Sequence, residues 1–245
     1  MKRFFLTICM SMAIVAMNDS VYAQDESTNR LNLSLDVGSG FAWRGTTLNT
    51  TPVIQPSFTF TLGNFFIGTW TSTPFVVDRW HSSFQGLDVF IGYQLLPSLT
   101  IGLTDYFFDW STSYFDYRRA VTGHALDLHL SYDGSGSFPI RAMASTIIAG
   151  NDVVLRDNIW RNNFSTYIEL GYGNTFNGID WEVCVGGVLM ESDFYGTERF
   201  SLINLGFGLS KSFEITPTYS LPLSLQFIVN PVAESVFLVA TISLF

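Results

Sequence analysis

This sequence is poor in charge, and the basic sign is the scarcer one. Charged residues make up 13% of its 245 residues, where a soluble protein has roughly 25%. There are 12 Lys and Arg against 21 Asp and Glu, which gives a net charge of −9. An acidic chain with so few basic residues has no electrostatic footprint for nucleic acid. Nucleic acid is therefore excluded as a partner.

Cysteine is almost absent as well. Cys184 is the only cysteine outside the N-terminal apolar segment, so the processed chain cannot form an intramolecular disulfide. No His/Cys spacing fits zinc. The glycine-rich segments 171–173 and 206–208 alternate as strands do and precede no helix, so they are not phosphate loops. We predict no metal site and no cofactor, and we expect these glycines to make room for inward side chains of neighbouring strands.

The N-terminus has the form of a secretory signal peptide. Lys2 and Arg3 precede an apolar stretch over residues 4–17, and the small residue Ala23 follows shortly after. The stretch is too short to span a bilayer and is typical of the h-region of a cleaved signal. We predict that residues 1–23 are a signal peptide and that the mature chain is 24–245.

Long apolar runs are missing from the rest of the chain, which is nevertheless rich in aromatic residues at 16%. No run of 18 or more apolar residues occurs, so a helical membrane span is excluded. Instead, apolar side chains alternate with polar or small ones. The clearest unit covers residues 54–72, around a Gly63-Asn64 pair that is typical of a two-residue turn with positive φ angles. Because successive strand side chains point to opposite faces, this hairpin has one apolar and one polar face.

Twelve segments of this kind follow one another, each roughly the ten residues that a tilted strand needs to cross a bilayer. They cover residues 31–44, 54–62, 65–72, 87–93, 99–108, 126–132, 140–148, 164–172, 179–189, 203–210, 221–229 and 236–245. In lipid every backbone group must be bonded internally, so only helices and closed barrels can cross. We therefore predict an all-β fold, a transmembrane antiparallel up-and-down β-barrel of 12 strands in the bacterial outer membrane.

The lengths of the connections agree with that topology. Counted from a periplasmic N-terminus, the odd-numbered connections should be surface loops and the even-numbered ones short turns. The longer loops are expected over residues 73–83, 109–123, 150–162 and 191–199, which hold most of the basic residues, and turns near Gly63, Pro97, Gly134, Thr175 and over 211–219.

For two of the strands the sequence does not decide which face points outward. In the fifth, Asp105 shares the parity of the outward Ile101 and Leu103, so a β-bulge or a reversed facing is needed. The twelfth alternates poorly. It ends in Phe245, which matches the terminal aromatic that the barrel-assembly machinery of the outer membrane reads.

Several short segments resemble one family in their order and spacing. They are Phe41-Ala42-Trp43-Arg44-Gly45, Ile67-Gly68-Thr69-Trp70-Thr71-Ser72, Leu87-Asp88-Val89-Phe90-Ile91-Gly92-Tyr93, Thr104-Asp105-Tyr106 and Asn230-Pro231. Together they resemble the TorF-type porins, a family of bacterial outer-membrane β-barrels. The resemblance implies a channel for small solutes, and it carries no catalytic residues.

A set of charged side chains falls on the inward parity of these strands. The members are Arg44, Asp88, Asp127, His129, Arg141, Glu169 and Glu182. Counting back from the expected turns places Glu169 nearly opposite Glu182, and Arg141 across from His129 and diagonal to Asp127. Two carboxylates that close resist ionising together. The set predicts either a constriction that selects solutes by charge or a self-neutralising network that fills a narrow lumen.

Two other classes of function were weighed. A lipid hydrolase needs a serine, a histidine base and an orienting group, but no motif pairs His81 or His124 with a serine, so we predict no enzyme and no catalytic residues. A non-conducting barrel could instead act as an anchor or receptor through its surface loops. Those loops carry aromatic residues that serve either binding or the aromatic girdle at the membrane interface. These are Trp80, Tyr114, Phe115, Tyr117 and Trp160.

Overall fold

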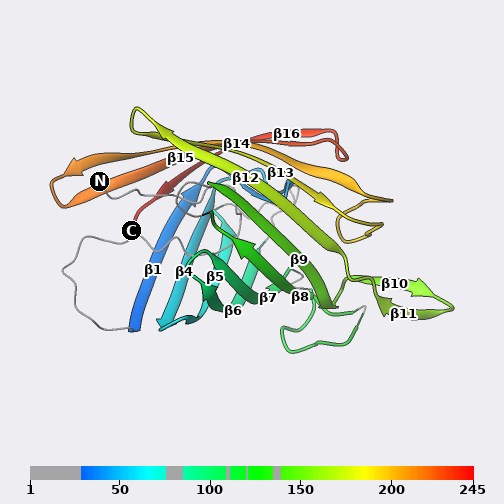
Figure 1. The fold of residues 1–245 in the computed structure, drawn as a ribbon. Coiled ribbons are helices and arrows are strands. Elements are labelled where there is room, and N and C mark those ends of the chain that lie inside the picture. Colours follow the sequence, from blue (N-terminus) through cyan, green and yellow to red (C-terminus); the bar gives the residue numbers. More distant parts are fainter. Residues whose placement is uncertain (1–28, 76–84, 109–110, 120, 135–138) are drawn as a thin grey trace.

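The computed structural model describes residues 29–75, 85–108, 111–119, 121–134 and 139–245. Within these residues twelve strands close into one antiparallel barrel, and two short hairpins stand apart from its sheet (Figure 1). The described residues contain no helix. None of them forms a helix long and apolar enough to cross a membrane. The expected signal peptide and Trp80 lie outside the described residues.

The barrel strands confirm the predicted number and order. They are β1 (Asn29–Gly38), β4 (Val53–Leu62), β5 (Phe65–Pro74), β6 (Gly86–Leu96), β7 (Leu99–Phe107), β8 (His124–Tyr132), β9 (Ile140–Gly150), β12 (Thr166–Phe176), β13 (Ile179–Val188), β14 (Ser201–Thr216), β15 (Tyr219–Asn230) and β16 (Ser235–Ser243). The separate hairpins are β2 (Phe41–Trp43) with β3 (Thr46–Asn49), and β10 (Val153–Arg156) with β11 (Ile159–Asn162). Neighbours in the sequence pair throughout the barrel, and β1 pairs with β16 to close it.

The wall has an apolar outer face and a more polar inner face. Outward side chains such as Leu31, Phe58 and Leu170 are 62%, 40% and 54% exposed. The alternating inward positions are buried, and Asp127 and Ser131 are both fully so. This period of two is what a strand with one face on each side of a closed sheet requires. The predicted alternation is therefore confirmed.

The structure shows which side chains face outward on the fifth and twelfth barrel strands, β7 and β16. On β7 the register with both neighbours runs unbroken past Asp105, so there is no bulge and its side chain keeps the outward parity. On β16 Leu238 is 67% exposed whereas Val239 is buried, so the even-numbered residues face outward. A bulge does occur where Gly186 and Gly187 face β14, and it turns Ile203, expected outside, into the interior.

The first strand ends earlier than predicted. We expected it to continue to Arg44, but β1 ends at Gly38 and the chain turns back into the β2–β3 hairpin. Glycine permits this turn, because a Cβ on Gly40 would lie 2.7 Å from the carbonyl oxygen of Asn49. Arg44 therefore lies in the turn between β2 and β3 and not on the barrel wall.

Candidate functional site

The β2–β3 hairpin lies inside the barrel, and we call residues 40–49 the plug. Its residues Phe41, Ala42 and Trp43 are between 5% and 7% exposed. They contact side chains from well-separated strands of the wall, with Phe41 against Trp70 of β5 and Ala42 against Ile228 of β15. The plug thus bridges the lumen from wall to wall.

Arg44 at the tip of the plug is held by a buried ion pair. Its Nη2 donates to Oδ2 of Asp127 on β8 at 2.6 Å, and the two side chains are 5% and 0% exposed. The hydroxyl of Tyr106 donates to the same carboxylate oxygen at 3.3 Å. Arg44 also donates to the hydroxyl of Tyr195. Its guanidinium lies 4.9 Å from the ring centre of Tyr167, a favourable cation–π distance.

Aromatic rings form a seat around Trp43 of the plug. The ring centres of Tyr106 and Phe108 lie 5.3 Å and 5.8 Å from that of Trp43. Phe194 and Tyr195, at 6.1 Å and 5.8 Å, come from the connection between β13 and β14. Such pairs each contribute about 0.5–1.5 kcal/mol beyond area burial. A second connection therefore folds inward and packs on the plug.

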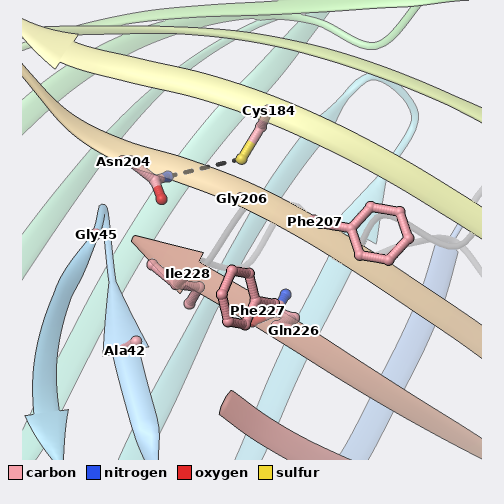
Figure 2. Close-up of a pocket in the computed structure, with 9 residues that line it drawn as sticks. All are labelled: Ala42, Gly45, Cys184, Asn204, Gly206, Phe207, Gln226, Phe227 and Ile228. Carbon is pink, nitrogen blue, oxygen red and sulfur yellow. Dashed lines mark hydrogen bonds between the residues drawn. The ribbon is translucent and has the colours of Figure 1, made fainter. Parts of the chain in front are cut away.

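At Gly45 the backbone of the plug lies directly against the wall. Its φ is 80°, and a Cβ there would lie 1.8 Å from the carbonyl oxygen of Ile203 on β14, so no other residue fits. The side-chain amide of Asn230 donates to the carbonyl oxygen of Gly45 at 3.1 Å. Figure 2 shows the small pocket beside this contact, with the side chain of Cys184 directed toward Asn204. The lining residues are Ala42, Gly45, Cys184, Asn204, Gly206, Phe207, Gln226, Phe227 and Ile228.

A second ion pair joins Arg141 of β9 to Glu182 of β13 across β12. Nη2 of Arg141 donates to Oε2 of Glu182, and the side chains are 15% and 5% exposed. Glycines make room for it, because a Cβ on Gly171 would lie 3.3 Å from Arg141 and one on Gly208 would lie 2.9 Å from Glu182. The expected role of these strand glycines is confirmed.

The predicted pairing of Glu169 with Glu182 is wrong. Glu169 lies opposite Gly186, and Glu182 lies opposite Gly173. The turn is at Asn177-Gly178, whose φ angles are 51° and 73°, and not near Thr175. This Asn-Gly pair is the strongest short turn signal available, and the count had overlooked it. Glu169 instead accepts hydrogen bonds from Tyr167 and from Asn204, the latter at 2.8 Å.

The predicted neighbours of Arg141 are also wrong. His129 lies opposite Ser145, and Tyr132 lies opposite Ala142, so Arg141 is four residues along β9 from the position opposite His129. We expected this turn near Gly134, but the register of β8 with β9 requires a longer connection than the count allowed. A longer connection moves the whole register of β9.

Asp88 and His129 complete the expected set. Asp88 is 1% exposed, and neither carboxylate oxygen has a hydrogen-bond partner among the described residues. On the neighbouring strands its register partners are Trp70 and Tyr106. His129 lies against Gly102 of β7. The seven predicted residues thus all face the interior, but they form separate contacts instead of one ladder.

The outward Asp105 is covered by the connection between β7 and β8. His124 is fully buried, with Nδ1 at 2.9 Å from Asp105 and Nε2 at 2.6 Å from the carbonyl oxygen of Tyr114. The hydroxyl of Tyr117 donates to Asp105 at 2.8 Å. Burial together with this carboxylate raises the pKa of Tyr117. Both ring nitrogens of His124 therefore lie at hydrogen-bond distance from acceptor oxygens.

Sequence reasoning missed the plug and its tyrosines. Gly38 and Gly40, and then Arg44-Gly45 directly after the short apolar segment 41–43, were the available signals of a turn back into the barrel. Within the part of the chain that the structure describes, no group of three or more His, Cys, Asp and Glu could hold a metal ion. No protein-family model matches the sequence, and no curated protein is significantly similar to it.

Proposed function

We propose that this chain is an outer-membrane β-barrel that crosses the bilayer with its twelve strands and conducts small solutes when the plug leaves the lumen. At rest the plug closes the barrel. The lumen would then resemble that of a gated channel, and not the wide opening of a general diffusion porin. We also propose membership of the TorF-type porins, on the segments that resemble that family.

The outer face supports insertion into lipid. Large apolar side chains on it are exposed all round the barrel, among them Leu33, Phe60, Ile91, Leu130, Phe207 and Leu238. A contiguous apolar surface of this extent is not compatible with a soluble monomer. An apolar band with closed strand pairing satisfies what a bilayer requires. Phe245 is 68% exposed, as the proposed contact with the assembly machinery requires.

The inner face supports passage of polar solutes. Several fully buried polar atoms have no hydrogen-bond partner among the described residues, and they come from strands around the barrel. They include atoms of Thr59, Asp88, Ser131, Ser145, Glu182 and Ser210. In native proteins such atoms are usually bonded to water. We therefore expect the lumen away from the plug to be hydrated.

The observation that carries the proposal is the attachment of the plug. The plug is held at its tip by the pair of Arg44 with Asp127, at its side by the contact of Gly45 with the wall, and by the aromatic seat around Trp43. Among the described residues its two strands pair with each other and with no barrel strand. It can therefore leave without breaking the ladder of the wall. A polar lumen with a detachable occupant is the arrangement of a gated passage.

Planar-bilayer recording of the mature chain tests this proposal. The comparison is with a variant in which residues 40–49 are replaced by a short Gly-Ser linker. We expect rare openings for the native chain and a persistent conductance for the variant. Absence of current from both would overturn the channel proposal, provided that both insert and migrate as folded barrels.

The second candidate is a non-conducting barrel that acts through its surface loops. The packing of Phe194 and Tyr195 on the plug favours it, because two connections then fill the lumen together. Exposed aromatics such as Phe115, which is 86% exposed, would supply the contact surface. This candidate predicts that neither the native chain nor the variant without the plug passes current, although both insert normally.

A further inference from the structure

The β10–β11 hairpin projects from the barrel without a core of its own, and we call residues 153–162 the arm. It follows β9, precedes β12 and extends beyond the ends of these strands (Figure 1). Its turn residues Asp157 and Asn158 have φ angles of 53° and 60°, as in a type I′ turn. An isolated two-stranded hairpin is only marginally stable in water. A surface that covers the arm would stabilise it.

Apolar side chains of the arm are exposed. Leu155, Ile159 and Trp160 are 51%, 56% and 48% exposed. Leu155 pairs directly with Trp160 across the two strands, so the two side chains form one patch. Exposing three large apolar groups on ten residues is unfavourable in water, and an apolar contact would remove that cost.

The arm and the β7–β8 connection beside it carry several positive charges, although the protein as a whole is acidic. Arg156 and Arg161 lie on the arm and are exposed, and Nη1 of Arg119 donates to the carbonyl oxygen of Trp160 at 3.2 Å. Asp157 is the one acidic residue of the arm, at 3.9 Å from Arg161, and it is 88% exposed. Three arginines against one carboxylate stand out in a chain with a net charge of −9.

Exposed apolar residues follow the arm along the chain. Phe164, just after the arm, is 51% exposed, and Ile168 and Leu170, in one column on the outer face of β12, are 37% and 54% exposed. If this column meets lipid, the arm stands where the strands leave the bilayer. Tryptophan and arginine beside apolar groups are typical of the membrane interface, where the long arginine stems lie along the apolar layer and the charged ends reach the headgroups.

We propose that the arm is a binding site for the phosphate groups of anionic lipids in the membrane that holds the barrel. Leu155 and Trp160 enter the boundary of the acyl layer, and Arg119, Arg156 and Arg161 bind the phosphates. The guanidinium fork matches a phosphate group in two parallel hydrogen bonds. This inference rests on the proposed membrane insertion, but it does not depend on whether the lumen conducts.

Lipid retention measures the site directly. The mature chain is purified from mixed micelles of phosphatidylcholine and phosphatidylglycerol, and the bound lipid is quantified by mass spectrometry. The test variant is Arg119→Gln/Arg156→Gln/Arg161→Gln. The control, Arg118→Gln/Arg199→Gln/Lys211→Gln, has the same net charge and an intact arm. We expect the native chain and the control to retain phosphatidylglycerol in preference to phosphatidylcholine. The test variant should lose about fivefold in affinity for each arginine removed at low salt.

A second readout places the arm at the interface. In vesicles with brominated acyl chains, Trp160 should be quenched, and the quenched fraction is the difference between the native chain and Trp160→Phe. Equal retention of phosphatidylglycerol by test variant and native chain, or an unquenched Trp160, would overturn the inference. So would displacement of the lipid by inorganic phosphate at equal concentration, because the source would then be a soluble anion. Failure of every version to insert would instead count against the proposed function.

Discussion

Removing the charge of Arg44 should release the plug. In Arg44→Gln the guanidinium that pairs with Asp127 is lost, and the carboxylate stays fully buried beneath the seated plug. The hydroxyl of Tyr195 loses its donor at the same time. When the plug leaves, Asp127 regains water in both proteins, so the cost falls on the closed state alone. The variant therefore shifts the balance toward the open barrel.

The size of the shift follows from the burial of the pair. Breaking a buried ion pair by removing one partner costs about 3–5 kcal/mol. At about 1.4 kcal/mol for each tenfold change, this corresponds to a factor of roughly 100–3,000 in the ratio of open to closed states. Glutamine can still donate one hydrogen bond, so we expect the lower part of that range. A native chain that is open for a small fraction of the time would become open for most of it.

The assay is the open probability in planar bilayers, with Arg141→Gln as the matched control. That control breaks the Arg141–Glu182 pair, which is similarly buried but joins two strands of the wall. We expect openings to increase in Arg44→Gln and to stay near the native level in Arg141→Gln. The reasoning is refuted if both folded variants record the native open probability, or if Arg141→Gln opens the barrel as much as Arg44→Gln does.

Four further outcomes can be checked. Gly45→Ala should open the barrel as Arg44→Gln does, because a Cβ there would lie 1.8 Å from a β14 carbonyl oxygen; native conductance would count against the plug contact. In the plug-deleted barrel Glu182→Gln should lower the permeability of cations relative to anions, measured as a reversal potential, and an unchanged potential would contradict an acidic lumen. The bonds from Arg118 lower the pKa of Asp116 to about 2, so its carboxylate should stay ionised below the ordinary pKa of 3.8 and be protonated only as the pH falls toward 2; carboxyl NMR should show this midpoint rise in Arg118→Gln. Cys184 is buried beside the plug, so a maleimide should label it slowly in the native barrel and faster in folded Arg44→Gln, and rapid labelling of the native folded barrel would argue against the packing around it.

The wall could be predicted from the sequence because its determinants are local. A period of two fixes the facing of Leu31, Leu33, Phe58 and Phe60, and each short turn joins neighbouring strands. Closure then follows, since the chain offers no other way to satisfy strand edges in lipid. The awkward position of Asp105 was visible too, although its remedy is the neighbouring connection and not a bulge.

The interior could not be predicted because it depends on distant residues. Phe41-Ala42-Trp43 continues the alternation of β1, so only the glycines at positions 38 and 40 separate the plug locally from the strand before it. The pairing of Arg44 with Asp127 joins residues 83 positions apart, and only the closed barrel brings them together. The positions of Glu169 and Glu182 depended on the site of one turn. An error of two residues in that turn moved every inward pair along the two strands.

The most direct test of the whole account is whether the outward side chains lie in acyl chains. Single cysteines replacing Phe60 and Leu128, both outward and exposed, carry a fluorescent label in vesicles whose lipids are brominated along the tail. A label at the inward Thr59 serves as the reference. We predict strong quenching at the two outward sites and little at the reference. A processed chain that stays in solution without detergent as a compact monomer, with all three labels unquenched, would contradict membrane insertion.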